Sequence, residues 1–539
     1  MTPPPKADEL VPHPVKDQLP GVDYCVNSNP SWAEAIILGF QHYLVMLGTS
    51  VIIPTVIVPQ MGGGNEEKAQ VIQTLLFVAG LNTLLQSWFG TRLPVVIGGS
   101  FTFIVPTVFV ALSSRYNTYL HPHERFKQTM RGMQGALMIA SILPILIGFL
   151  GIWRIVVRFL SPLSAAPLVL LVGLGLYVQG FPLLAECVEI GLPQLIILIL
   201  LSQYIPHMWK LKHPIFERFA VLLSVGIVWA YAALLTVTGA YNNRSPQTQF
   251  SCRVDRSGFI SGASWIRFPY PWQWGAPKVY AGEAFVMMAA ALVSLVESTG
   301  AFIAAARYGS VTHTPNSVLS RGAGWLVGRC TRIIIFKGLG ILLNGLWGTA
   351  TGSTVSVENV GLLALTRVGS RRVIQISAIF MLFFSVLGKF GAVVASIPLP
   401  IIGALYCVFF ALMSSAGLGL LQFCNLNSFR TKFILGFSIY LGLSVPQYFN
   451  GYVITTGDGP VHSSSAWFNK TMQVIFTSPA TVAGIVALFL DITLARKHAT
   501  TKRDNGSHWW AKFKYFDKDP RSEEFYSLPY GLSKYFPSV

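Results

Sequence analysis

The amino-acid sequence predicts an all-α polytopic membrane protein with fourteen transmembrane segments, arranged as two inverted repeats of seven. Three observations support this prediction. First, 52% of the 539 residues are hydrophobic and 11% are charged, whereas soluble globular proteins carry about 25% charged residues. Second, fourteen apolar runs approach the roughly 20 residues that a membrane-spanning helix needs. Third, one run in each half is interrupted at the same place, which is the best sequence signal for a binding site between inverted repeats.

The expected segments follow one another in chain order, with one long polar loop near the midpoint. The first seven cover residues 35–58, 71–89, 93–106, 135–150, 165–177, 192–204 and 219–237. The second seven cover residues 284–306, 338–350, 351–367, 373–394, 397–420, 433–445 and 476–494. The third and tenth are the interrupted ones. The repeat is visible in the hydropathy pattern and not residue by residue.

These segments divide the chain into five regions. We expect a disordered cytoplasmic arm, a first repeat, an extracellular loop, a second repeat and a cytoplasmic tail, over residues 1–30, 31–240, 241–281, 282–495 and 496–539. The net charge of +17 is explained by basic residues in cytoplasmic loops. No basic soluble domain that would bind nucleic acid is visible.

Sidedness is indicated by basic loops and by glycosylation sequons. Loops assigned to the cytoplasm are rich in Arg and Lys, and the sequons at Asn243 and Asn469 fall in loops assigned to the outside. The loop over residues 115–131 is an exception, because it is basic yet external. A third sequon, at Asn505, lies in the cytoplasmic tail and should stay unmodified.

The six cysteines are scattered and show no metal-binding spacing. Cys187 and Cys252 both fall in external loops, so a bridge between them is open, but two unrelated free thiols are the favoured interpretation. The sequence shows no pairing of nucleophile and base, no metal cluster and no phosphate-binding loop. We therefore expect no enzyme activity, no metal and no cofactor.

The tenth segment, over residues 351–367, holds the clearest functional signal. Small and β-branched residues surround Glu358 and Asn359, and backbone that is not helical at membrane depth survives only when protein or a water-filled cavity covers it. A carboxylate beside a carboxamide offers acceptors and donors in one plane, which suits a flat heterocycle with ring N–H and C=O groups. The alternative is a Glu at a helix end that meets a cytoplasmic Arg.

Other polar residues lie inside apolar segments. Glu297 stands amid Ala, Leu and Val in the eighth segment, where an acid must be protonated, paired or exposed to a cavity. Together with Glu358 it suggests proton handling. Gln41 and His42 lie in the first segment. Phe101 follows two glycines in the third, where it would stack on a flat ring and offer a backbone N–H. For Glu297, Gln41 and His42 the alternative is a structural hydrogen bond to a neighbouring helix, and for Phe101 it is ordinary packing.

Several motifs resemble one known family, the nucleobase–ascorbate transporters, also called nucleobase:cation symporters. The family signature is Gln, Glu or Pro, then Asn, any residue, Gly, four residues, Thr, and Arg, Lys or Gly. This chain resembles it in Glu358-Asn359-Val360-Gly361 and Thr366-Arg367. Three more motifs resemble the family in chain order, namely Gln41-His42, Ser100-Phe101 and Glu297 in Glu-Ser-Thr-Gly. The resemblance covers about residues 31–494, and residues 361–372 look most like the plant branch.

The resemblance implies a fourteen-helix fold of core and gate domains, with short strands in segments three and ten and an elevator movement, often in a homodimer. It implies that Glu297 and Glu358 bind substrate through their side chains, and that Phe101 and Val357 bind it through their backbone. The remaining implied site or supporting residues are His42, Gln41, Asn359, Ser100, Gly361, Thr366 and Arg367.

The resemblance also implies a function. We expect a secondary-active transporter of purines such as xanthine, adenine or guanine, or of uracil, coupled to protons or to sodium, in the lipid bilayer of the plasma membrane. Ascorbate carriers of the family tend to have Pro where this chain has Glu358, so Glu358 favours a nucleobase. An ascorbate or other organic-anion carrier of the same architecture is the alternative, and a channel is a more remote one.

Two positions depart from the family pattern. Many microbial relatives have His or Asp four residues after the eighth-segment acid, whereas this chain has Ala301, so no coupling role is carried over to that position. Residues 326–337 intervene before the ninth segment and bring three basic residues to its edge. We expect this insertion to bulge on the cytoplasmic side or to impair the carrier.

Overall fold

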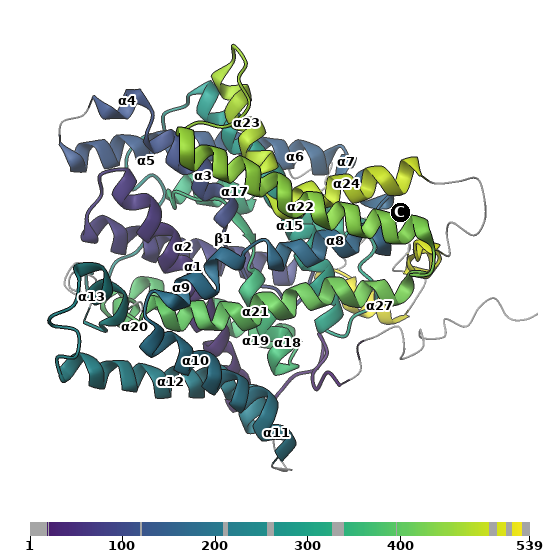
Figure 1. Ribbon diagram of the computed structural model, residues 1–539, viewed down its shortest axis with the longest axis horizontal. Coiled ribbons are helices and arrows are strands. Elements are labelled where there is room, and N and C mark those ends of the chain that lie inside the picture. The colour runs from purple at the N-terminus through teal and green to yellow at the C-terminus, as the bar shows by residue number, and fades with distance from the viewer. Residues whose placement is uncertain are drawn as a thin grey trace, which may run out of the picture.

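The computed structural model describes residues 19, 21–118, 121–208, 214–255, 263–325, 339–394, 396–494, 504–513 and 520–530. Within these ranges, long helices run side by side through the molecule and two short strands lie among them (Figure 1). Eight of the described helices are long and apolar enough to cross a membrane, or up to ten if each of two bent pairs counts as one span. The chain is therefore a polytopic, mostly helical membrane protein, and the count of fourteen segments stays a prediction.

The elements follow the expected order. The first half contains α1 Trp32–Gln60, α2 Asn65–Trp88, β1 Ile97–Gly99, η2 Phe101–Phe103, α3 Ile104–Ala111, α4 Ser114–Asn117, α5 Pro122–Ala140, α6 Ile142–Phe149, α7 Ile152–Arg158, α8 Pro162–Leu174, η3 Tyr177–Gln179, α9 Phe181–Ala185, α10 Val188–Ile199, η4 Leu200–Tyr204, α11 Ile205–Met208, α12 Ile215–Val237 and α13 Pro246–Cys252.

The second half contains α15 Ala281–Tyr308, α16 Asn316–Trp325, α17 Leu339–Trp347, β2 Ser353–Val355, α18 Val357–Thr366, α19 Arg371–Val386, α20 Gly388–Val394, α21 Leu399–Gly419, η5 Leu420–Phe423, α22 Phe429–Thr456, α23 Ala466–Phe476 and α24 Pro479–Thr493. The tail adds α26 Ser507–Trp510, η6 Ala511–Phe513 and α27 Pro520–Tyr526. Two expected segments are bent pairs, α19 with α20 at 114° and α23 with α24 at 82°.

The two interrupted segments meet as an antiparallel pair of strands. Ile97, Gly98 and Gly99 of β1 lie opposite Val355, Thr354 and Ser353 of β2. The pairing extends beyond the strands, because the Ser100 N–H donates to the Gly352 carbonyl at 3.1 Å and the Ser356 N–H donates to the Val96 carbonyl at 2.9 Å. Lipid offers no hydrogen-bond partners to backbone N–H and C=O groups, so each strand provides the partners for the backbone groups of the other. These are the short strands that the resemblance implies.

A helix begins directly after each strand. η2 and α3 follow β1, and α18 follows β2. Ser356 caps α18 by accepting a hydrogen bond from the Asn359 N–H at 3.3 Å, as an N-cap serine commonly does. The strand pair therefore places two helix N-termini, with their partial positive charge, near one point inside the molecule.

The helices pack in two groups. The strand-bearing bundle comprises α1, α2, α3, α5, α15, α17, α18 and α19. The outer bundle comprises α8, α9, α10, α12, α21, α22 and α24. The two groups meet where α18 packs against α21. A Cβ added at Gly361 would lie 2.4 Å from the backbone carbonyl oxygen of Phe409 and 2.6 Å from its Cα, so only glycine fits this crossing.

A disulfide joins Cys187, between α9 and α10, to Cys252 at the end of α13. The favoured interpretation of two unrelated free thiols is therefore wrong. The two cysteines are 65 residues apart in separate loops, and only the helix packing brings the loops together, so spacing in the sequence gives no sign of the bond. Cys25, Cys407 and Cys424 are free thiols, and Cys330 lies outside the described residues.

The loops expected at the surface have local partners. In the basic loop that is expected to be external, Arg115 forms an ion pair of 2.9 Å with Glu283, and Arg131 donates to the Ala276 carbonyl at 2.8 Å. The Glu283 carboxylate offsets one of the positive charges of this loop. Among the sequons, Asn243 is exposed, whereas the Asn505 amide donates to the Asp491 carboxylate at 3.3 Å.

The arm and the tail contact the bundles where the structure describes them. The Asp23 N–H donates to the Arg367 carbonyl at 3.0 Å, and the Val26 N–H donates to the Gly309 carbonyl at 3.2 Å. These bonds tie residues 21–30, part of the expected disordered arm, to the ends of α18 and α15. The inserted residues 326–337 lie outside the described residues.

We predict that the disulfide is detectable in the mature protein. Because Cys187 and Cys252 are bonded to each other, alkylation before reduction should label neither, while a peptide pair linking them should appear by mass spectrometry and vanish after reduction. Recovery of Cys252 alkylated without reduction would contradict the assignment.

We predict that Gly361→Ala destabilises the protein. The added methyl group meets backbone atoms of Phe409, which cannot rotate away, and overpacking of this kind costs about 1–3 kcal/mol. Thermal unfolding of the detergent-purified protein should show a lower midpoint. Gly436→Ala is the matched control, because a Cβ there has no neighbour within 4 Å and alanine favours a helix. An equal midpoint for the two variants would contradict the prediction.

Candidate substrate-binding site

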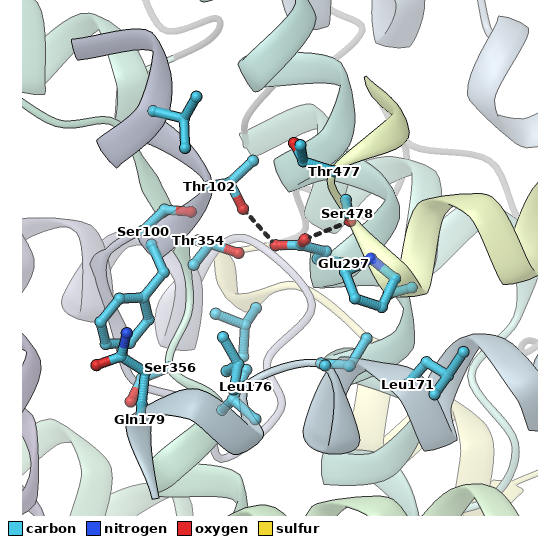
Figure 2. Close-up of a pocket in the computed structure, with 18 of the residues that line it drawn as sticks. Ser100, Thr102, Leu171, Leu176, Gln179, Glu297, Thr354, Ser356, Thr477 and Ser478 are labelled. Atoms are coloured by element: carbon cyan, nitrogen blue, oxygen red, sulfur yellow. Dashed lines mark hydrogen bonds between the residues drawn. The ribbon is translucent and has the colours of Figure 1, made fainter. Parts of the chain in front are cut away.

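A cavity of about 240 Å³ lies between the two bundles, beside the strand pair (Figure 2). Its lining comes from the turn after β1, the end of α8 and the residues after it, α15, the turn between β2 and α18, α22, and the bend between α23 and α24. The main lining residues are Ser100, Phe101, Thr102, Leu171, Leu176, Gln179, Glu297, Thr354, Ser356, Val357, Glu358, Asn450, Thr477 and Ser478. Pockets for drug-sized ligands have volumes of about 300–1,000 Å³, so this cavity suits a smaller molecule.

Glu297 is held by two hydroxyl groups. Thr102 Oγ donates to one carboxylate oxygen at 2.6 Å, and Ser478 Oγ donates to the other at 2.8 Å. Figure 2 shows both bonds, with Glu297 between the two side chains. In the part of the chain that the structure describes, no Arg or Lys forms an ion pair with Glu297. Each oxygen keeps a further acceptor site, so the acid can bind a donor in the cavity.

Glu358 lines the same cavity from the first turn of α18. Its side chain is buried and accepts a hydrogen bond from Thr49 of α1. The Thr49 hydroxyl also lies 2.9 Å from the Tyr406 hydroxyl of α21. The helix N-terminus favours negative charge at this position. Glu358 is thus oriented by Thr49 of the strand-bearing bundle, and Thr49 in turn contacts Tyr406 of the outer bundle.

Asn359 and His42 lie behind the cavity wall. The Asn359 amide nitrogen donates to Ser356 Oγ at 2.8 Å, and its oxygen lies 2.8 Å from His42 Nδ1. Since that oxygen can only accept, Nδ1 carries the proton. Neither side chain is among the lining residues. The pair fixes the turn that presents Glu358.

Gln41 and His42 point to different neighbours. The Gln41 amide donates to the Arg218 carbonyl at 3.1 Å, at the start of α12. Arg218 itself pairs with Asp23 at 3.0 Å and with Glu34. The structure therefore places Gln41 at a contact between α1 and α12, and outside the cavity lining.

Backbone groups of the two interrupted segments face the cavity. Phe101 and Val357 both line it, and each is the first residue of a helix, where backbone N–H groups have no partner within the helix. Ser100 also lines the cavity, and its buried hydroxyl has no hydrogen-bond partner. These groups add donors beside the two acids.

The remaining motif residues lie along α18 away from the cavity. Gly361 permits the approach to α21 described above. The Thr366 hydroxyl donates to the Leu362 carbonyl at 2.9 Å. Arg367 ends the helix with a φ of 56° and pairs with Glu217 of α12 at 3.0 Å. Ala301 is buried in α15 and brings no ionisable group.

Sequence reasoning missed the residues that hold the acids. Thr102, Ser478 and Thr49 contact the acids, and Tyr406 contacts Thr49; these four residues come from separate parts of the chain, and no short motif links them. The sequence does contain one signal for Ser478, because a serine followed by proline is typical of a helix start. A helix start inside an expected membrane segment indicates that the segment is interrupted there.

Comparison with known proteins agrees with the motifs. Residues 33–451 match the protein family profile described as Permease family (Xan_ur_permease). The chain is 62% identical to nucleobase-ascorbate transporter 7 of Arabidopsis thaliana, over 100% of this chain and 98% of that protein. It is 56% identical to nucleobase-ascorbate transporter LPE1 of Zea mays, over 100% of both chains. Among solved structures, SLC26A9 resembles it with a TM-score of 0.45 and 10% identity, over 86% of this chain and 66% of that chain.

The matched family and the plant relatives are membrane transporters by name, and the apolar helices and the cavity lined by two acids agree with that assignment. The chain therefore belongs to the nucleobase–ascorbate transporter family and is a multi-pass membrane transporter of a small molecule.

Proposed function

We propose that the protein is a secondary-active transporter of nucleobases, with purines such as xanthine, adenine or guanine, and uracil, as substrates. The observation that carries this proposal is the cavity in which Glu297, Glu358 and the backbone of two helix starts converge. A nucleobase is flat and carries N–H and C=O groups on its edges. Its N–H groups suit the two carboxylates, and its carbonyl oxygens suit the backbone N–H groups of Phe101 and Val357.

The charge of the cavity favours a nucleobase over ascorbate. Ascorbate is an anion at neutral pH, and two carboxylates in one enclosed space would repel it. Among the residues that the structure describes, no Lys or Arg lines the cavity. The names of the plant relatives include both substrate classes, so an ascorbate or other organic-anion carrier is the second candidate.

Proton coupling is part of the proposal. Glu297 accepts hydrogen bonds from two neutral hydroxyls, and a buried carboxylate without a cation is costly. A proton taken up with the substrate would remove that cost and allow the loaded site to move. Sodium is the alternative coupling ion.

The bundles suggest how the substrate moves. We infer fourteen segments in two inverted repeats, in which the strand-bearing bundle is the core domain and the outer bundle is the gate domain. The core domain contributes the two acids to the cavity, and the gate domain contributes Leu171, Leu176 and Ser478. An elevator movement of the core along the gate would carry the site across the membrane. The working unit in this proposal is a homodimer in the plasma membrane, glycosylated at Asn243 and Asn469.

We predict that Glu297→Ala and Glu358→Ala each lower uptake of radiolabelled xanthine or uracil by about 10- to 100-fold, since each hydrogen bond to a charged group contributes roughly 1.5–3 kcal/mol. Uptake is measured in cells that lack their own carriers, with surface expression checked by a fluorescent tag. Glu283→Ala is the control, because Glu283 lies on the same helix but does not line the cavity. Normal uptake by either cavity variant would count against the proposal.

We predict that uptake of a labelled base is faster at an external pH of about 5.5 than at about 7.5, because a proton would accompany the base. A protonophore should abolish the difference.

Excess unlabelled base should compete for uptake of the labelled base, and excess ascorbate should not. Competition by ascorbate alone would favour the anion carrier, dependence on external sodium would replace the proton, and unitary currents under voltage clamp would indicate a channel.

A further inference from the structure

A second cavity, of about 500 Å³, lies where α2 ends and α19 begins, beside the tail helix α27. Its lining includes three arginines, Arg92, Arg371 and Arg372, and one acid, Glu524. Glu524 accepts a hydrogen bond from Asn27 at 2.9 Å. The lining therefore carries a net positive charge, and it is separate from the substrate cavity.

Arg92 has unused hydrogen-bonding capacity. Arg92 follows α2 and has a φ of 61°, so the chain turns sharply there. The backbone carbonyl of Arg92 accepts a hydrogen bond from Arg371 Nε at 2.8 Å. The Nε of Arg92 itself is buried and has no hydrogen-bond partner. A buried donor without a partner costs about 1–3 kcal/mol, which is a reason to look for a missing acceptor.

The neighbouring arginines are satisfied by neutral groups. Arg371 also donates to the Phe525 carbonyl at 3.1 Å, and Arg321 donates to the carbonyls of Gly90 and Tyr526 at 2.8 Å each. Carbonyl partners fix the guanidinium groups without neutralising them. Burial, with repulsion from Arg92 as a smaller cause, lowers the pKa of Arg321 to about 9. The positive charges of Arg92 and Arg371 repel that of Arg321, and a bound anion would offset this repulsion.

Two exposed tryptophans place this cavity at the membrane surface. The Arg372 guanidinium lies 4.7 Å from the ring centre of Trp32, and Trp88 lines the cavity itself. Their exposed fractions are 65% and 45%. Exposed tryptophans at the ends of membrane helices are typical of the headgroup level of the bilayer.

We propose that this cavity binds the phosphate group of an anionic lipid headgroup through Arg92 and Arg372. Guanidinium groups match phosphate oxygens in pairs, and the cavity opens where the headgroups lie. Glu524 opposes the anion and limits its affinity. Arg371 and Arg321 supply positive charge from behind while they hold the tail. This site is independent of the transport substrate.

The test uses the full-length protein purified in a neutral detergent. Binding of dioctanoyl phosphatidylinositol 4-phosphate is measured by native mass spectrometry and by the shift of the thermal unfolding midpoint, with dioctanoyl phosphatidylcholine as the zwitterionic comparison. Loss of one charge-assisted contact should raise the dissociation constant about tenfold in Arg92→Gln and in Arg372→Gln. Arg158→Gln is the matched control, because Arg158 is exposed and does not line the cavity. Glu524→Gln should bind the lipid more tightly.

The outcomes separate the sources of phosphate. Binding of the anionic lipid that weakens in the two cavity variants and persists in Arg158→Gln supports the proposal. Equal binding of inorganic phosphate would overturn the assignment to lipid, and equal weakening in Arg158→Gln would overturn the site. Arg92→Lys keeps the charge but loses the paired geometry, so it should bind with intermediate affinity. Gel filtration of each variant shows that it remains folded.

Discussion

The pairing of β1 with β2 is the constraint on which the rest of the structure depends. Each strand interrupts a segment at membrane depth, where the bilayer offers no hydrogen-bond partner to the backbone. Neither interruption is tolerable alone, and together they satisfy each other through the register of Gly98 with Thr354. This pairing requires that segments more than 250 residues apart in the sequence lie side by side. It also directs the helix starts at Phe101 and Val357 toward one cavity.

Polar side chains around that cavity hold the two acids, Glu297 and Glu358, in place. Asn359, held by Ser356 and His42, fixes the turn before α18, and Thr49 orients the acid that this turn presents. Glu297 is fixed separately by Thr102 and Ser478. Hydroxyl donors orient a carboxylate without neutralising it, so both acids keep their capacity to accept a proton or a substrate N–H group. A lysine or arginine in their place would have fixed the charge permanently.

The sequence allowed the interrupted segments and both acids to be predicted, because glycines, β-branched residues and a carboxylate are conspicuous in an apolar run. It did not allow their supports to be predicted. Thr49 and Ser478 are ordinary polar residues of membrane helices, and they gain a role only when packing brings them to an acid. The same holds for the Cys187–Cys252 bond. Gln41 looked equivalent to His42 by adjacency, yet successive residues of a helix point about 100° apart, and the two reach different neighbours.

The hydrogen bond from Ser478 to Glu297 joins the outer bundle to the strand-bearing bundle at the cavity itself. The ion pair of Glu217 with Arg367 and the bond from Gln41 to the Arg218 carbonyl join the same bundles elsewhere, at the start of α12. If the bundles slide as proposed, all three contacts must break together. A substrate N–H group that binds a remaining acceptor site of Glu297 shares the carboxylate with Ser478 and weakens the contact nearest to it. The site and the movement would then be coupled through one carboxylate, without any longer chain of interactions.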